Sequence, residues 1–184
     1  LHYFPMFRTW FGLCGFCKLP WNDVVHPKNA ESKEPAKIPH HVQNYVDIYS
    51  GVTGNEITKE DLIDMSERVY NFQRVFNIRL GYGLREHDSI PYRSAGPVTE
   101  EEYKSRADRY DDQIREWFGL DPDEMTLEEK MTKHREHRFD QYQKLIDAVY
   151  KRRGSTDNGV PTPEKLESLG IDFPEVLAVV EQHL

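Results

Sequence analysis

The sequence has very little cysteine, since Cys14 and Cys17 are the only two. They lie too close together for a disulfide between them to link distant parts of the fold. No other cysteine remains to build a disulfide framework. The sequence also lacks an excess of positive charge: 24 Lys and Arg face 32 Asp and Glu, so the formal net charge is −8. A nucleic-acid binder is expected to carry a basic stripe, so this balance argues against that class and suits a soluble, cytoplasmic protein.

Long apolar runs and common catalytic signatures are missing as well. The densest apolar stretch opens the chain, but Arg8 interrupts it, and Lys18 and Pro20 end it well short of a membrane span. This stretch has neither the basic start nor the small-residue cleavage site of a signal peptide. No G-x-G-x-x-G motif, P-loop or nucleophile elbow occurs. We therefore assign no catalytic acid, base or nucleophile from the sequence.

The residues that are present divide the sequence into three regions. Residues 1–21 are apolar, and because they open a chain without an initial Met, we expect them to pack against other parts of a longer protein. Residues 22–39 are polar, contain three prolines and predict a surface loop or linker. Residues 40–184 predict a helical domain, because no alternating strand pattern of useful length occurs. The expected fold class is mainly α.

Capping signals and glycines set the expected helix boundaries. The clearest helix opens with a capping-box pair, Thr58 and Asp61, and ends at Gly81 and Gly83. Spacings of three and four predict one apolar face, formed by Leu62, Met65, Val69, Phe72, Phe76 and Leu80. Further helices are expected at residues 40–50, 99–119, 126–154, 163–169 and 174–182. The strong charge of residues 130–138 predicts that the longest helix bridges solvent or breaks there.

Two residues separate Cys14 from Cys17, a spacing that lets both sulfurs face one centre. Such a pair occurs in redox dithiols, in zinc sites and in iron–sulfur sites. A thioredoxin-like dithiol needs a preceding strand and a βαβ context, and a zinc site needs a second pair of ligands; the sequence predicts neither. The cysteines can equally be two buried thiols in an aromatic-rich turn, because free cysteine behaves as a small apolar residue. The spacing alone leaves these alternatives open.

The histidines give a weaker signal. His134 and His137 lie three residues apart on an expected helix and can share a face, as metal ligands do. They stand within the charged residues 130–138, however, where a solvated helix face is the simpler interpretation. No nearby carboxylates complete a set of ligands, so we do not predict a metal site there.

Three separated stretches resemble the C-terminal third of the aldehyde ferredoxin oxidoreductase family. Residues 12–14, Gly-Leu-Cys, are similar to the end of the family motif D-x-x-G-L-C. Residues 67–79 are similar to its helix motif E-R-x-x-N-L-x-R-x-F-N-x-R, and residues 88–93 to the D-x-L-P-x-R that follows. Residues 150–170 are similar to its closing motif Y-x-x-R-G-W-x-x-x-G-V-P-T-x-x-K-L-x-x-L-G. The order and spacing of the stretches match too, so the resemblance covers most of the chain.

This resemblance implies the C-terminal helical domain of an oxidoreductase with a tungsten–bis-pterin (tungstopterin) and a 4Fe-4S cluster. Three cluster cysteines of the family lie far upstream, and the fourth matches Cys14. Thr9, Leu13 and Gly15 match positions that contact the pterin, so residues 1–21 are expected to form the loop region beside both cofactors. The implied partners are a ferredoxin-like electron-transfer protein or iron–sulfur subunit, and the rest of the same polypeptide, which carries the substrate pocket.

The sequence departs from the family pattern in four places. The motif's Asp is Thr9, its Trp after Arg-Gly is Ser155, Cys17 is additional, and a helical insertion is expected at about residues 95–143. Thr9 can still form a hydrogen bond, but it offers no carboxylate to the amino groups of a pterin. The departures indicate a divergent branch, such as the catalytic subunits of class II benzoyl-CoA reductases, which reduce an aromatic acyl-CoA in place of converting an aldehyde or carboxylate. A non-catalytic helical module that binds another protein through residues 100–150 is the alternative from a different class.

Overall fold

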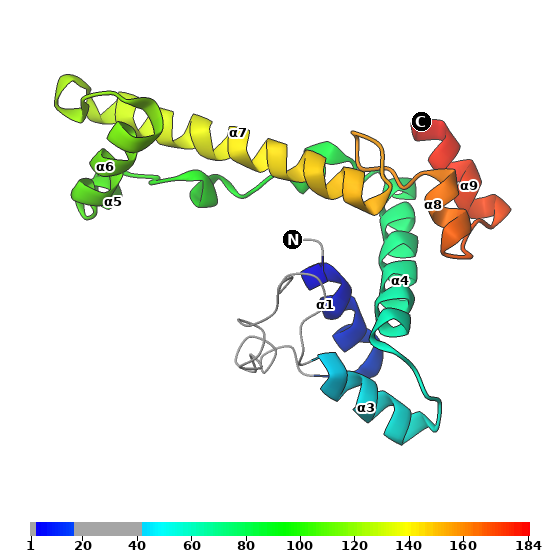
Figure 1. Ribbon diagram of the computed structural model, residues 1–184. Coiled ribbons are helices and arrows are strands. Elements are labelled where there is room, and N and C mark those ends of the chain that lie inside the picture. The colour runs from blue at the N-terminus through cyan, green and yellow to red at the C-terminus, as the bar shows by residue number, and fades with distance from the viewer. Residues whose placement is uncertain (1–2, 17–41) are drawn as a thin grey trace. The chain divides into compact units, whose positions relative to one another are not determined.

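The computed structural model describes residues 3–16 and 42–184. Its α-helices are α1 (Tyr3–Cys14), α3 (Val42–Thr53), α4 (Lys59–Arg79), α5 (Glu100–Lys104), α6 (Ala107–Phe118), α7 (Leu127–Arg153), α8 (Pro163–Ser168) and α9 (Pro174–Val180) (Figure 1). In this described part, one isolated β-bridge joins Ser155 to Pro161 and no strand forms, so the prediction of a mainly α fold is confirmed. None of its helices is long and apolar enough to cross a membrane. The expected linker at 22–39 and Cys17 lie outside the described residues.

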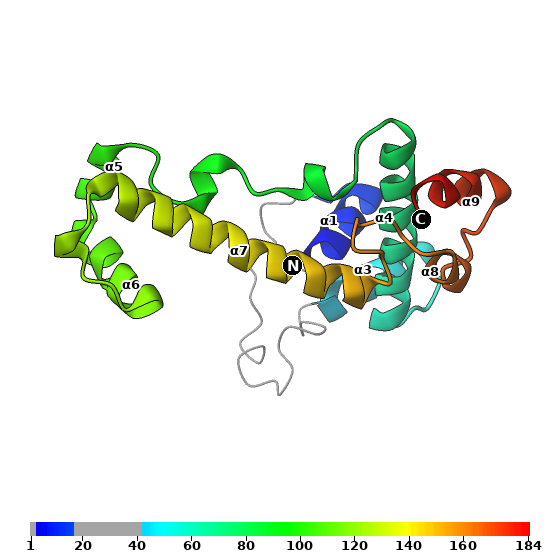
Figure 2. The same ribbon diagram turned by 90° about the horizontal axis from the view of Figure 1, so that it is seen from above.

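The chain forms two compact units. The first contains residues 1–84 and 149–184, and the second contains residues 85–148. The insertion expected from the sequence lies within the second unit. In the first unit, α4 is the central helix: α1 and α3 pack against its N-terminal part and α9 packs near its C-terminal end (Figures 1 and 2).

Helix α4 begins and ends where the sequence predicts. The Thr58 hydroxyl accepts a hydrogen bond of 3.1 Å from the Asp61 backbone N–H, and the Asp61 carboxylate accepts one of 2.8 Å from the Thr58 backbone N–H. The Thr58 backbone N–H and the Thr58 hydroxyl both donate to the Asp61 carboxylate, and these two bonds lower the pKa of Asp61. At the other end, the Gly81 N–H donates to the Ile78 carbonyl and the Tyr82 N–H donates to the Asn77 carbonyl, each at 2.9 Å. This pair of bonds is the Schellman ending that the glycine signal indicated.

The buried face of α4 differs from the predicted one. Phe72, Phe76 and Leu80 are 44%, 51% and 57% exposed, whereas Val75 and Ile78 are buried. The reason is that α4 serves two separate cores on different sides along its length. One core joins α1, α3 and the start of α4 through Phe7, Trp10, Phe11, Val42, Val46, Leu62 and Ile63. The other joins the end of α4 to the C-terminal segment through Val75, Ile78, Val160, Leu166, Leu169, Ile171, Val176 and Val180.

Other boundaries also depart from the predictions. Residues 3–14 form a helix, not a loop, because Phe7, Trp10 and Phe11 recur at helical spacing and bury one face. Helix α3 continues through Ser50 and Gly51 to Thr53. The helix expected over 99–119 is two helices, since the backbone leaves helical geometry at Arg106 (φ −139°). Helix α7 runs unbroken through the charged residues 130–138.

Charged side chains of α4 hold the C-terminal segment. Glu67 forms a 3.0 Å ion pair with Lys165, and the Arg68 Nε–H donates to the Leu169 carbonyl at 2.8 Å. Farther along α4, the Arg74 Nε–H donates to the Gly159 carbonyl at 3.1 Å. The helix motif and the closing motif of the sequence are therefore in direct contact, which gives a physical reason for their occurrence together.

The contact at Gly159 generates a stability prediction. Gly159 has a φ of +79°, and a Cβ there would clash with Arg74 Nη2 and lie 2.7 Å from the Tyr150 hydroxyl oxygen. We expect Gly159→Ala to lower the free energy of unfolding by about 2–4 kcal/mol, because backbone strain and overpacking add together. Gly170 is the matched control, since its φ is +63° but no atom lies within 4 Å of a Cβ there. Gly170→Ala is expected to cost only about 1–2 kcal/mol, and equal losses in urea unfolding would contradict the contact argument.

Candidate functional site

Helix α1 presents the predicted site residues on two faces. Cys14 is half-buried and packs against the aromatic core of α1, α3 and α4. Thr9 and Leu13, four residues apart, lie on another side of the helix, where they line a pocket. Adjacent positions on a helix differ by about 100°, so the predicted metal ligand and the predicted pterin contacts lie on neighbouring faces of one helix end.

The pocket is a cavity of about 510 Å³ between α1 and α4. Its α1 wall consists of Pro5, Arg8, Thr9, Gly12 and Leu13, and its α4 wall consists of Tyr70 and Gln73. Leu13 is 52% exposed, which leaves an apolar surface open in the pocket. The structure thus brings Thr9 and Leu13 together, and it adds two α4 residues that the sequence analysis missed.

Gly15 follows the end of α1 and does not line this pocket. Its φ is +70°, and no atom lies within 4 Å of the position that a Cβ would take. The backbone at Gly15 is therefore open to close approach by another group.

Two of the polar groups in the pocket are already engaged. The Thr9 hydroxyl donates a 3.0 Å hydrogen bond to the Pro5 carbonyl inside α1, so only its acceptor lone pairs are available. The Tyr70 hydroxyl accepts a 2.8 Å hydrogen bond from Arg153 Nη1, and the Arg153 guanidinium lies 4.7 Å from the Tyr70 ring centroid. Tyr70 is consequently held as a fixed part of the wall.

Cys14 has the environment of a neutral thiol. Burial raises the pKa of Cys14, because a thiolate is poorly solvated beside Phe11 and Phe16. Within residues 3–16 and 42–184, no group of three or more His, Cys, Asp or Glu is arranged to hold a metal ion. The described residues therefore supply one possible metal ligand at this position, the Cys14 thiol. A metal centre here needs its other ligands from outside the described residues.

The raised pKa of Cys14 can be tested in the metal-free Cys17→Ser chain. Because only the thiolate reacts with iodoacetamide, the alkylation rate of Cys14 should rise with pH around a midpoint above that of the same chain unfolded in urea. The midpoint, and not the absolute rate, isolates the pKa from simple shielding of the sulfur. A folded-state midpoint at or below the urea value would contradict the burial argument.

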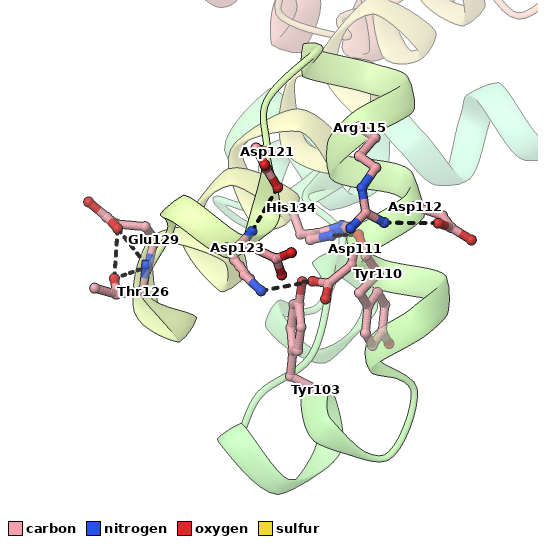
Figure 3. Close-up of polar contacts among 11 residues, drawn as sticks. Tyr103, Tyr110, Asp111, Asp112, Arg115, Asp121, Asp123, Thr126, Glu129 and His134 are labelled. Atoms are coloured by element: carbon pink, nitrogen blue, oxygen red, sulfur yellow. Dashed lines mark hydrogen bonds and ion pairs between the residues drawn. The ribbon is translucent and has the colours of Figure 1, made fainter.

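The second unit buries a histidine that the sequence analysis placed on a solvated face. His134 of α7 is only 1% exposed, and its Nε2–H donates to the Tyr110 carbonyl at 2.9 Å (Figure 3). The rings of Tyr110 and Trp117 lie 5.1 and 5.3 Å from the imidazole centroid. Tyr110 and Trp117 are seven residues apart, so both project from the same side of α6. This spacing is the sequence signal for the aromatic face of α6 that packs against His134. The solvated interpretation is therefore wrong for His134.

A half-buried carboxylate connects α5, α6 and α7 beside this histidine. Asp111 accepts hydrogen bonds from the Tyr103 hydroxyl at 2.7 Å and from Lys130 Nζ at 3.1 Å (Figure 3). Burial opposes ionisation of Asp111, but these two bonds outweigh it and lower its pKa. Burial and the same hydrogen bond raise the pKa of Tyr103. His137 stacks on Trp117 with centroids 4.4 Å apart, so the His134/His137 pair serves packing between helices.

The burial of His134 predicts a pH dependence. Burial lowers the pKa of His134, although its hydrogen bond to Tyr110 opposes the shift. The unfolded chain then binds more protons than the folded chain, so the free energy of unfolding should fall as the pH drops through the ordinary histidine value of about 6.5. An NMR titration of the His134 ring, assigned by its loss in His134→Gln, should show a midpoint below that of the chain in urea. A midpoint equal to or above it would contradict this account.

Comparison with known proteins agrees with the resemblance seen in the sequence. The family model described as aldehyde ferredoxin oxidoreductase, domains 2 and 3, matches residues 1–171. The mainly α fold is that of a C-terminal helical domain of an oxidoreductase, and the chain belongs to the aldehyde ferredoxin oxidoreductase family.

A curated relative is similar over part of its length. The tungsten-containing aldehyde ferredoxin oxidoreductase of Pyrococcus furiosus is 26% identical over 129 residues. The match covers 70% of this chain but only 16% of that protein, so the chain spans a small part of the relative's length. No solved structure matches the chain.

Proposed function

We propose that the chain is the C-terminal part of a tungsten–bis-pterin, iron–sulfur oxidoreductase. In this proposal α1 forms one wall of a pterin site, and Cys14 supplies one thiolate to a 4Fe-4S cluster. The observation that supports it most directly is that Thr9 and Leu13 line one pocket while Cys14, the next residue, lies on the neighbouring face. Membership of the family supports a shared role for these three positions.

The residues of this region fit both groups. A cofactor pocket commonly combines apolar walls with a few placed polar groups, as Leu13, Thr9 and Gln73 do here. The open backbone at Gly15 allows a ring system to approach closely. The Cys14 sulfur is a soft ligand that suits iron, and a bound cation would offset the burial that keeps the thiol neutral.

When bound, the tungsten–pterin would supply low-potential two-electron chemistry, and the cluster would exchange electrons with a ferredoxin-like protein or an iron–sulfur subunit. The residues of this chain bind and orient. Leu13 would cover apolar surface of the cofactor and keep water from it, and the Thr9 lone pairs would accept a hydrogen bond from its polar edge. Acid–base groups that act on the substrate belong to the upstream part of the polypeptide.

The substrate in this proposal is an aldehyde or its carboxylate, or an aromatic acyl-CoA in a benzoyl-CoA reductase-like enzyme of the cytoplasm. Residues 85–148 support the second substrate class, because they form a compact unit of their own that suits docking within a larger complex. Assays of the full-length protein with benzaldehyde and with benzoyl-CoA, using a low-potential viologen, distinguish the two classes.

Metal analysis of the full-length protein, purified without oxygen, tests the proposal. We expect tungsten together with about four iron atoms per chain for one 4Fe-4S cluster. Cys14→Ser should lower the iron content and disturb the EPR signal of the reduced cluster, because one ligand is lost. Cys17→Ser is the matched control and should change both much less.

Two results would contradict this proposal. A wild-type protein without tungsten and iron would favour the alternative, a non-catalytic helical module that binds a partner through residues 100–150. Equal loss of the cluster signal in both serine variants would refute the assignment of the ligand to Cys14 alone.

A further inference from the structure

The α4 wall of the pocket contains a side chain with no assigned role. The fixed residues of the α4 motif, Glu67, Arg68 and Arg74, hold the C-terminal segment. Tyr70 and Gln73 stand at positions that the motif leaves open, and these two line the pocket. Glu67, Arg68 and Arg74 of α4 therefore have a structural role, whereas Tyr70 and Gln73 face the pocket.

Gln73 brings to this pocket an amide that can meet a ligand as both donor and acceptor. Gln73 is exposed, and its amide forms no hydrogen bond within the described part of the chain. The Thr9 hydroxyl hydrogen is bound to the Pro5 carbonyl, and the Tyr70 hydroxyl oxygen accepts from Arg153, which leaves the Tyr70 hydroxyl hydrogen as a donor. An amide offers one acceptor oxygen and two donor hydrogens in one plane.

We propose that Gln73 recognises the aminopyrimidinone edge of the pterin. That edge carries an amino group and a ring N–H, which donate, beside a ring carbonyl, which accepts. The Gln73 carbonyl oxygen accepts from the donors and its NH₂ group donates to the ring carbonyl, while Leu13 and the fixed Tyr70 confine the ring in the pocket. This inference rests on the proposed function, because it requires that the full-length protein binds a pterin.

The same geometry explains how the pocket functions without a carboxylate at position 9. Thr9 stands on the α1 wall and offers only weak acceptor lone pairs, so strong recognition has to come from the opposite wall. A carboxylate placed at position 9 would face the same pocket and could accept from the same pterin donors. Gln73 and an Asp at position 9 are thus expected to substitute for one another.

The test uses the full-length protein purified without oxygen, in four forms: wild type, Gln73→Ala, Gln141→Ala, and Gln73→Ala combined with Thr9→Asp. Gln141 is the matched control, because it is an exposed helical glutamine of α7 that does not line the pocket. The readouts are tungsten per chain, pterin released as its fluorescent oxidised form, and the rate at which both leave the folded protein. Far-UV circular dichroism checks that each variant keeps its helical content.

We expect Gln73→Ala to release pterin and tungsten about tenfold faster than the wild type, as one lost hydrogen bond to a ligand implies. Gln141→Ala should match the wild type, and Thr9→Asp should restore retention in the Gln73→Ala background. Wild-type retention in Gln73→Ala, or no rescue by Thr9→Asp, would overturn the inference while leaving the proposed function intact. A wild-type protein that contains no pterin would refute the proposed function and, with it, this inference.

Discussion

The first unit depends on the charged contacts between α4 and the C-terminal segment. Arg68 and Arg74 each donate to a backbone carbonyl of a segment that has almost no ladder hydrogen bonds of its own in the described structure. A hydrogen bond from a charged group contributes about 1.5–3 kcal/mol, more than a typical neutral one. These bonds and the ion pair of Glu67 with Lys165 fix the position of the apolar residues that complete the C-terminal core.

This constraint extends to the pocket through Tyr70 and Arg153. Arg153 ends α7, is buried, and donates to the Tyr70 hydroxyl from the sequence region that the α4 charges hold in place. The hydrogen bond from Arg153 therefore holds the α4 wall of the pocket through Tyr70. The aromatic core around Phe11 holds the α1 wall. Both walls of the pocket are thus supported by other parts of the first unit, and such support is what positions a bound group accurately.

Local signals in the sequence predicted helix ends better than helix faces. The cap at Thr58 and the ending at Gly81 depend on neighbouring residues alone, so the sequence was sufficient to locate them. Which side of α4 is buried depends on α1 and α9, which contact it at different points along its length, and Phe72 and Phe76 were misassigned for that reason. The burial of His134 was missed because it requires aromatic partners from another helix within a strongly charged sequence.

The candidate site, too, could be predicted only in part from the sequence. The motif ending at Cys14 directed attention to Thr9 and Leu13, but nothing in the sequence pointed to Gln73, because α4 meets α1 only in the folded chain. Burial of Cys14 favours a neutral thiol, whereas a ligand to iron must be a thiolate. The two requirements agree if a positively charged metal centre stands beside the sulfur, since its field offsets the desolvation of the thiolate. Cys14 is therefore expected to be a neutral thiol in the isolated chain and a thiolate beside iron.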